Sequence, residues 1–104
     1  HHDAMIAFTS QIPHALACAY VMSPCCPQHR GFSAGSYRDV SRVANINEVL
    51  WSELFLDNAE PLQTELNTLI RNLSTIRDAI AAKDQPKLES LLRQGRLVKE
   101  ELGE

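Results

Sequence analysis

Apolar residues recur at helical spacing from the beginning of the chain. Between Asp3 and Met22 they return every three or four positions and leave few polar positions, which predicts a mostly buried helix. Pro13 lies inside this stretch, and because proline has no backbone N–H, we expect a kink where a carbonyl loses its usual partner. Four polar residues gather around the predicted kink: Thr9, Ser10, Gln11 and His14. A histidine placed there is either a core residue bonded to a carbonyl or part of a site.

The most regular pattern lies in the second half of the chain. We define the leucine seam as the residues that alternate steps of four and three there: Leu62, Leu66, Leu69, Leu73, Ile76 and Ile80. This is the rhythm of a helix that packs lengthwise against other helices. The run "KDQPK", residues 83–87, then ends the pattern, with Asp84 as a cap and Pro86 in the first turn of a last helix. The two helices are expected to form an antiparallel hairpin.

Helix length predicts an oligomer. A continuous helix from about Asn58 to Lys83 would be roughly 39 Å long, which exceeds the core of a compact domain of this size. We therefore expect the far end of the leucine seam to meet a second copy of the chain across a two-fold interface. A monomeric bundle with a bent helix is the alternative.

The segment between the two helical regions is less regular. Residues 23–36, "SPCCPQHRGFSAGS", have the proline, glycine and serine content of a loop. A short helix is expected from about Tyr37, and Asn45 with Glu48 reads as the cap and capping partner of the next amphipathic helix. The sequence contains no alternating pattern typical of strands. These features predict an all-α helical bundle with a kinked N-terminal helix and a long C-terminal helical hairpin.

Composition narrows the class of protein. A chain of 104 residues predicts one domain, spanning residues 1–104, and the apolar fraction of 44% with 22% charged residues is typical of globular proteins. Every unbroken apolar run is far shorter than a bilayer span, so we expect no membrane partner. The net charge of −3 gives no general electrostatic reason to bind nucleic acid, so an anionic ligand would need a local site.

The cysteines bear on the cellular compartment, and the first residues bear on where the protein chain begins. Cys18, Cys25 and Cys26 follow no secretory signal, which favours thiols in a reducing cytoplasm over a disulfide framework. A zinc site that adds His29 to the adjacent cysteines lacks a second ligand pair, so we expect no metal. The start "HHD" has no initiator Met, which suggests a piece of a longer protein or a tag remnant at His1.

Two arginines are the main candidates for ligand binding. Arg38 and Arg42 share one helix face just after a glycine- and serine-containing loop, where a helix N-terminus favours anions and an arginine can hold a carboxylate at two points. The plain alternative is a surface ion pair between Asp39 and Arg42. The four glycines of the chain build neither a dinucleotide fingerprint nor a phosphate-binding loop, and Ser10 with His14 lacks the other parts of a hydrolytic triad.

The stretches "HDAMIAFTSQIPHALACAYV" and "GSYRDVSRVANINEVLWSELFLDN" resemble the C-terminal helical domain of prephenate dehydrogenases. The most specific elements are the pair His2–Asp3, the Ser-x-x-Pro-His run that ends at His14, the Arg-Asp-x-x-Arg run from Arg38 to Arg42, and Trp51 followed by "ELFLDN". The resemblance spans nearly the whole chain.

The resemblance implies a larger enzyme of tyrosine biosynthesis that is cytoplasmic. In that family a Rossmann domain absent from this sequence binds NAD or NADP, and an intertwined helical domain forms a homodimer. Prephenate loses a hydride and carbon dioxide to give 4-hydroxyphenylpyruvate. The usual catalytic histidine belongs to the other half, so this fragment is expected to be inactive and to bind no cofactor by itself.

The resemblance also implies roles for individual residues. Arg42 looks like the anchor of a substrate carboxylate, His14 and Trp51 look like pocket residues, and the backbone of Gly35 is similar to one that lies against substrate. Asp39 resembles an acid that reaches the partner subunit's site or restrains an arginine. Gln11 is expected to lie beside the substrate. Ser10 and Arg38 are expected to lie behind the residues that contact it.

Two departures from the family pattern leave alternatives open. Gln11 stands where the family often has a histidine, and Gly35, Ser36 and Tyr37 replace a Gly-Gly-Phe run, so arogenate stays possible as substrate and tyrosine feedback is undecided. A stand-alone helical dimerisation or interaction module is the alternative function. A small helical sensor of aromatic carboxylates is a third.

Overall fold

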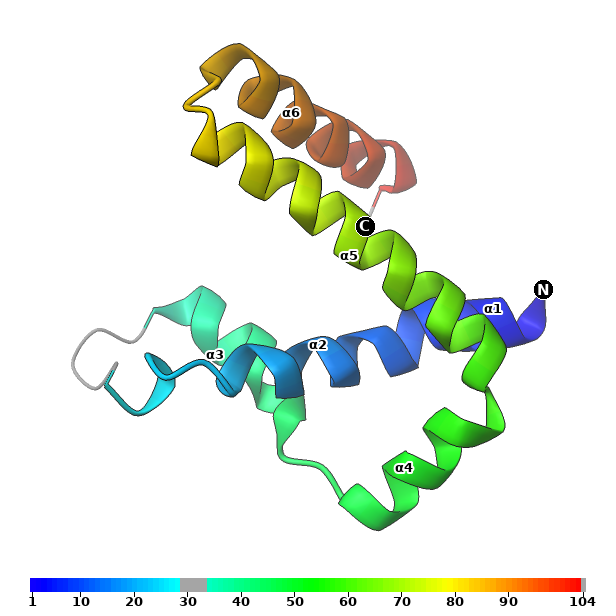
Figure 1. Cartoon of the computed structure of the whole chain (residues 1–104). Coiled ribbons are helices and arrows are strands. Elements are labelled where there is room, and N and C mark those ends of the chain that lie inside the picture. The colour runs from blue at the N-terminus through cyan, green and yellow to red at the C-terminus, as the bar shows by residue number, and fades with distance from the viewer. Residues whose placement is uncertain (29–33, 104) are drawn as a thin grey trace. The chain divides into compact units, whose positions relative to one another are not determined.

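The computed structural model describes residues 1–28 and 34–103, and every regular element within these ranges is helical. The chain divides into two compact units, His1–Leu66 and Asn67–Glu104, which are described separately below. The all-α prediction is confirmed, while the prediction of a single domain stays a prediction. The helices shown in Figure 1 are α1 (His2–Ile6), α2 (Ile12–Val21), α3 (Gly35–Ser41), α4 (Glu48–Asp57), α5 (Ala59–Ala81) and α6 (Gln85–Leu102).

The N-terminal helix contains a change of hydrogen-bonding register. Between α1 and α2 lies a π-helical turn, η1 (Ala7–Gln11), in which the backbone N–H of Ile12 donates to the carbonyl of Ala7, five residues earlier. Pro13 lies two residues after this turn, and its missing N–H means that the regular pattern cannot run straight through this region. The predicted kink at Pro13 therefore takes the form of a π turn that ends two residues before it.

The prediction that residues 3–22 are mostly buried is wrong for the single chain. The buried residues of this stretch are Ala7, Gln11, Ile12 and Ala17, whereas Phe8 is 58% exposed. Other large apolar side chains of this stretch, such as Met5 and Tyr20, are also exposed. By length and a mean hydropathy of 1.2, the stretch His2–Val21 is also able to cross a bilayer, a property that core helices share. The absence of a membrane partner stays a prediction.

Two short elements connect α2 to α4. Helix α3 continues into a 3-10 turn, η3 (Arg42–Ala44), and both pack along α2 (Figure 1). Helix α4 then begins at Glu48, where the side-chain oxygen of Asn47 accepts hydrogen bonds from the backbone N–H groups of Val49 and Leu50, both at 3.1 Å. The predicted cap at Asn45 is therefore wrong, because the 3-10 turn extends the connection and Asn47 occupies the capping position.

In the second unit, a three-residue connection joins α5 to α6. The backbone N–H of Asp84 donates to Ala79 O and that of Lys83 donates to Ile80 O, both at 3.0 Å, which is a Schellman motif with Lys83 in the left-handed region at φ 53°. Asp84 then caps α6, accepting from the N–H of Lys87 at 3.1 Å as predicted. Pro86 lies in the first turn of α6.

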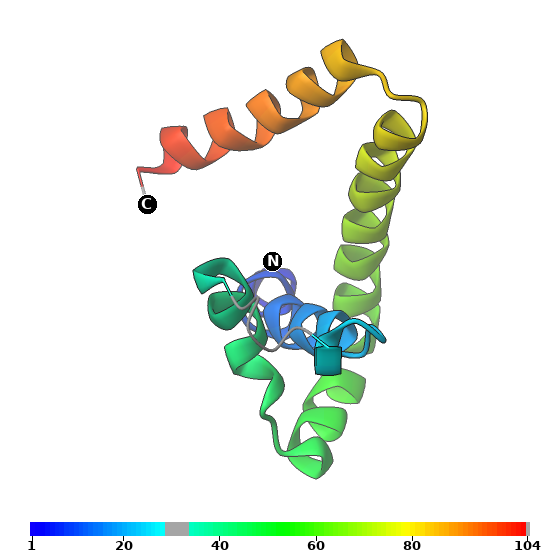
Figure 2. The ribbon, with the colours of Figure 1, turned by 90° about the vertical axis from the view of Figure 1, so that its left-hand side faces the viewer.

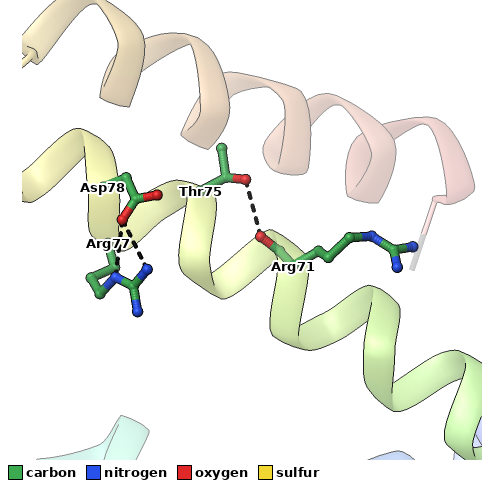
Figure 3. Close-up of polar contacts among 4 residues, drawn as sticks. All are labelled: Arg71, Thr75, Arg77 and Asp78. Atoms are coloured by element: carbon green, nitrogen blue, oxygen red, sulfur yellow. Dashed lines mark hydrogen bonds and ion pairs between the residues drawn. The ribbon is translucent and has the colours of Figure 1, made fainter.

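The predicted hairpin is present, but its two helices diverge from the connection (Figure 2). Large apolar residues are consequently exposed on both helices: Ile70, Leu73 and Ile80 on α5, and Leu92, Leu97, Val98 and Leu102 on α6. Two polar contacts of α5 join residues of the same helix. Figure 3 shows Thr75 donating to the carbonyl of Arg71 at 3.0 Å and Arg77 paired with Asp78 at 2.9 Å.

Candidate functional site

A stacked pair of rings joins α2 to α4 in the first unit. The imidazole of His14 lies against the indole of Trp51, with ring centroids 3.8 Å apart and planes inclined by 19°. Phe55, one turn further along α4, meets the indole edge-on at 5.9 Å. The Nδ1 atom of His14 is 2.8 Å from the carbonyl of Ser10. Because a carbonyl only accepts hydrogen bonds, Nδ1 carries the proton, and in the neutral ring Nε2 is the acceptor.

A buried amide network lies one turn before this pair. Gln11 is only 4% exposed, and its Nε2 donates to the carbonyl of Leu54 at 3.1 Å while its Oε1 accepts from Asn58 Nδ2 at 2.8 Å. Asn58 also donates to the carbonyl of Asp3 at 3.0 Å. The network ties the end of α4 to both parts of the N-terminal helix. It therefore fixes where the indole of Trp51 lies along the N-terminal helix, against the imidazole of His14.

In the described part of the chain, no ion pair neutralises the charges of Arg38 and Arg42. Arg38, Asp39 and Arg42 are all exposed, and within residues 1–28 and 34–103 their side chains make no hydrogen bond or ion pair. The alternative of a surface ion pair between Asp39 and Arg42 is therefore not formed. The guanidinium of Arg38 lies beside the backbone of Gly35, where an added Cβ would be 4.0 Å from its nitrogen.

The structure brings together one part of the predicted site. Gln11, His14 and Trp51 lie side by side on η1, α2 and α4, with the Ser10 carbonyl bonded to the imidazole. The exposed residues on α3 and η3, among them Arg42, make no hydrogen bond or ring contact with this group in the described part of the chain. Their substrate-binding roles stay predictions. Part of the predicted loop, residues 29–33, lies outside the described residues.

Sequence analysis missed two residues that organise the region. Asn58 ends α4 and completes the Gln11 network, a role that its place at the end of the "ELFLDN" run did not reveal. Tyr37 is the second, because its hydroxyl lies 3.3 Å from Cys26 Sγ. This hydrogen bond, together with partial burial, raises the pKa of the Tyr37 phenol above its ordinary value.

The described residues do not suit a metal or a dinucleotide. In residues 1–28 and 34–103 no three His, Cys, Asp or Glu side chains converge as a metal site would require. Over the same ranges no strand leads into a glycine-rich turn, which is the element that holds a dinucleotide pyrophosphate. What the region offers is an aromatic wall, a buried amide and exposed guanidinium groups. These groups suit the binding of an organic anion.

Comparison with known proteins assigns the family. Residues 1–94 match the family described as "Prephenate dehydrogenase, dimerization domain". The chain is 38% identical over 91 residues to the cyclohexadienyl dehydrogenase of Zymomonas mobilis, covering 81% of this chain and 31% of that protein. It is 26% identical over 92 residues to the prephenate dehydrogenase of Bacillus subtilis, covering 84% of this chain and 25% of that protein.

A solved structure shares the fold. The crystal structure of Synechocystis arogenate dehydrogenase superposes with a TM-score of 0.85 at 21% identity, over 97% of this chain and 39% of that one. The chain thus spans a third or less of the curated relatives, 31% and 25% of their lengths. Because the family match covers residues 1–94, the chain belongs to the family of prephenate dehydrogenase dimerization domains.

Proposed function

We propose that this chain is the C-terminal part of an NAD(P)-dependent dehydrogenase that acts on prephenate or arogenate. In this proposal it supplies a carboxylate anchor, part of the substrate pocket and a homodimer interface. Family membership supports the proposal, and the relatives are named cyclohexadienyl, prephenate and arogenate dehydrogenases. The enzyme would be cytoplasmic, and the isolated chain would be inactive.

The uncompensated charge of Arg42 carries the proposal. Prephenate is a dianion, and a pocket closed from water must offer fixed positive charge to a carboxylate. In the described part of the chain, the Arg42 guanidinium has no acidic partner that would compete with a ligand. It belongs to η3, which packs on α2, the helix that carries His14. Arginine suits this task because its fork matches both carboxylate oxygens.

The ring pair and the amide network would shape the pocket. Stacking on Trp51 and the bond to Ser10 O hold the imidazole of His14 in one orientation, which leaves Nε2 to meet a polar group of the substrate. Gln11 holds α4 in place, and the substrate would lie beside this wall. When bound, NAD(P) supplies the hydride acceptor. The residues described here offer it no phosphate-binding turn, so we assign its binding to the rest of the enzyme.

Replacing Arg42 by lysine in the full-length enzyme tests the anchor. We expect Arg42→Lys to raise KM for prephenate or arogenate by roughly 10- to 100-fold, because a point charge replaces a two-point fork. Steady-state kinetics measure the effect, with Arg77→Lys, an exposed substitution on α5, as the matched control. Equal kinetics for the two variants would favour a helical interaction module in which Arg42 is only a solvated charge.

A further inference from the structure

Helix α6 carries a seam of its own with a glycine at its centre. The residues that alternate steps of three and four along this helix are Leu88, Leu91, Gly95, Val98 and Leu102. Val98 and Leu102 are 54% and 64% exposed. A seam of this period is typical of a helix that packs lengthwise against another helix. Gly95 removes the side chain at the middle of that contact.

The same glycine faces a groove. Because α5 and α6 diverge (Figure 2), they leave a groove of about 370 Å³ between them. It is lined by Asn72, Thr75 and Ile76 of α5 and by Leu91, Gln94, Gly95 and Val98 of α6. In Figure 3, Arg77 points away from α6, so the Arg77–Asp78 ion pair does not fill the groove. The groove combines apolar and amide side chains, as helix contacts do.

No contact among the described residues explains the glycine. A Cβ added at Gly95 would meet no atom within 4 Å, and the backbone there is not in the left-handed region. Glycine inside a helix costs about 1 kcal/mol relative to alanine, so this position is destabilising in the isolated chain. A close approach of another backbone is the physical reason for a glycine on a packing face. The described residues place no backbone there, so the position is open to the backbone of another chain.

We propose that α6 of a second copy enters the groove and crosses α6 at Gly95, on the two-fold axis. The inference rests on the homodimer proposed above and names its crossing point, which lies just beyond the matched residues 1–94. We place this axis perpendicular to α6, so that the two α6 helices run antiparallel. Leu88 then lies opposite Leu102 of the partner subunit, and Leu91 lies opposite Val98 of the partner subunit. Each of these contacts pairs apolar residues and covers the exposed Val98 and Leu102.

Sedimentation equilibrium of three variants tests the crossing. We expect Gly95→Leu to weaken the dimer by at least about tenfold, since overpacking separates the helices. Gly95→Ala should weaken the dimer as well, even though alanine favours the helix. Ser90→Leu adds the same bulk to the exposed side of α6 away from the seam, and should leave the dissociation constant unchanged. An unchanged constant in Gly95→Leu would overturn the crossing.

Disulfide trapping gives an answer even if Gly95→Leu fails to fold. In a Cys25→Ser, Cys26→Ser background, Gly95→Cys should form an intermolecular disulfide on mild oxidation, because a crossing there brings the two Cα atoms within about 4.4–6.8 Å. Ser90→Cys is the matched control and should stay monomeric on a non-reducing gel. Failure of Gly95→Cys to cross-link in a dimeric protein would overturn the crossing. A wild-type chain that sediments as a monomer would instead overturn the homodimer itself.

Discussion

At the scale of single residues, one buried amide holds the candidate site together. Both polar ends of the Gln11 side chain are hydrogen bonded, one to the carbonyl of Leu54 and the other to Asn58. Buried polar groups stabilise a fold only while they are paired, and losing one partner costs more than the bond itself contributes. The side chain of Asn58 therefore matters to the position of α4 and of Trp51 upon it.

Removing that side chain should destabilise the protein. We expect Asn58→Ala to lower the free energy of unfolding by about 1–3 kcal/mol, because the buried Oε1 of Gln11 and the carbonyl of Asp3 lose a donor. Urea denaturation measures the change. Asn67→Ala, an exposed position on α5, should stay within about 0.5 kcal/mol of wild type. Equal effects of the two substitutions would show that the Gln11 network contributes little.

The phenol of Tyr37 gives a prediction about pH. Its hydrogen bond with Cys26 raises its pKa, so folding is favoured by this group below the ordinary phenol pKa of about 10, and that contribution is lost as the pH rises further. In a Tyr20→Phe background, Tyr37 is the remaining tyrosine and its ionisation can be followed by absorbance at alkaline pH. We expect Cys26→Ala to lower this pKa and Cys25→Ala to leave it unchanged. If the pKa of Tyr37 is unchanged in both variants, the hydrogen bond with Cys26 is not the cause of the raised pKa.

Some of these residues could be predicted from the sequence and others could not. The cluster of polar residues around Pro13 identified Gln11 and His14, because polar side chains on an apolar helix need partners. The partners themselves, Asn58 and Trp51, come from α4, and only the tertiary structure shows which turn of α4 faces the π turn. Arg42 makes no hydrogen bond or ion pair in the described part of the chain, so the sequence pattern had no local contact from which to predict its orientation.

At the scale of helices, ends and connections are decided by local chemistry. Asp84 and Pro86 predicted the start of α6 correctly, because both act within one turn of the chain. Two asparagines compete for the start of α4, and Asn47 is the cap because the 3-10 turn from Arg42 to Ala44 delays the helix. Periodicity detects the apolar face of a helix, but it does not detect such a delay.

The connection between α5 and α6 contains one strained backbone position, and a substitution there can relieve the strain. Lys83 occupies the left-handed position of the Schellman motif, where glycine has no Cβ penalty. We expect Lys83→Gly to raise the free energy of unfolding by about 1 kcal/mol. Arg93→Gly, an exposed position inside α6, should lower it by a similar amount. Thermal denaturation of both variants distinguishes the two signs, and a loss of stability in Lys83→Gly would contradict the strain.

At the scale of the whole molecule, exposed apolar surface is the dominant feature. Seam residues such as Leu73 and Ile80 are 50% and 58% exposed, although their spacing is that of a buried helix face. Helix length alone predicted that α5 would extend beyond its own core. The divergence of α6 from α5 was not predictable in this way, because a seam pattern does not distinguish an intramolecular partner from a second copy.

A charge placed in the seam should act on assembly. Because Leu73 is half exposed in the protomer, Leu73→Lys should have little effect on the monomer but should weaken the homodimer by about tenfold or more. The thermal midpoint of the wild-type chain should rise with protein concentration, and that of Leu73→Lys should not. Asn67→Lys is the control on an exposed position of the same helix. Concentration-independent melting of the wild type would contradict assembly through this seam.

The π turn has a consequence for how this site can change during evolution. A π-helical turn holds one residue more than the α-helical turn it replaces, so deleting one residue of Ala7–Gln11 would restore a regular turn and leave α1 and α2 presenting nearly the same faces. Such a deletion would keep Asp3 close to Asn58 and the imidazole of His14 on its own turn. The π turn is thus a point at which this helix can lose one residue while the stacked rings of His14 and Trp51 stay together.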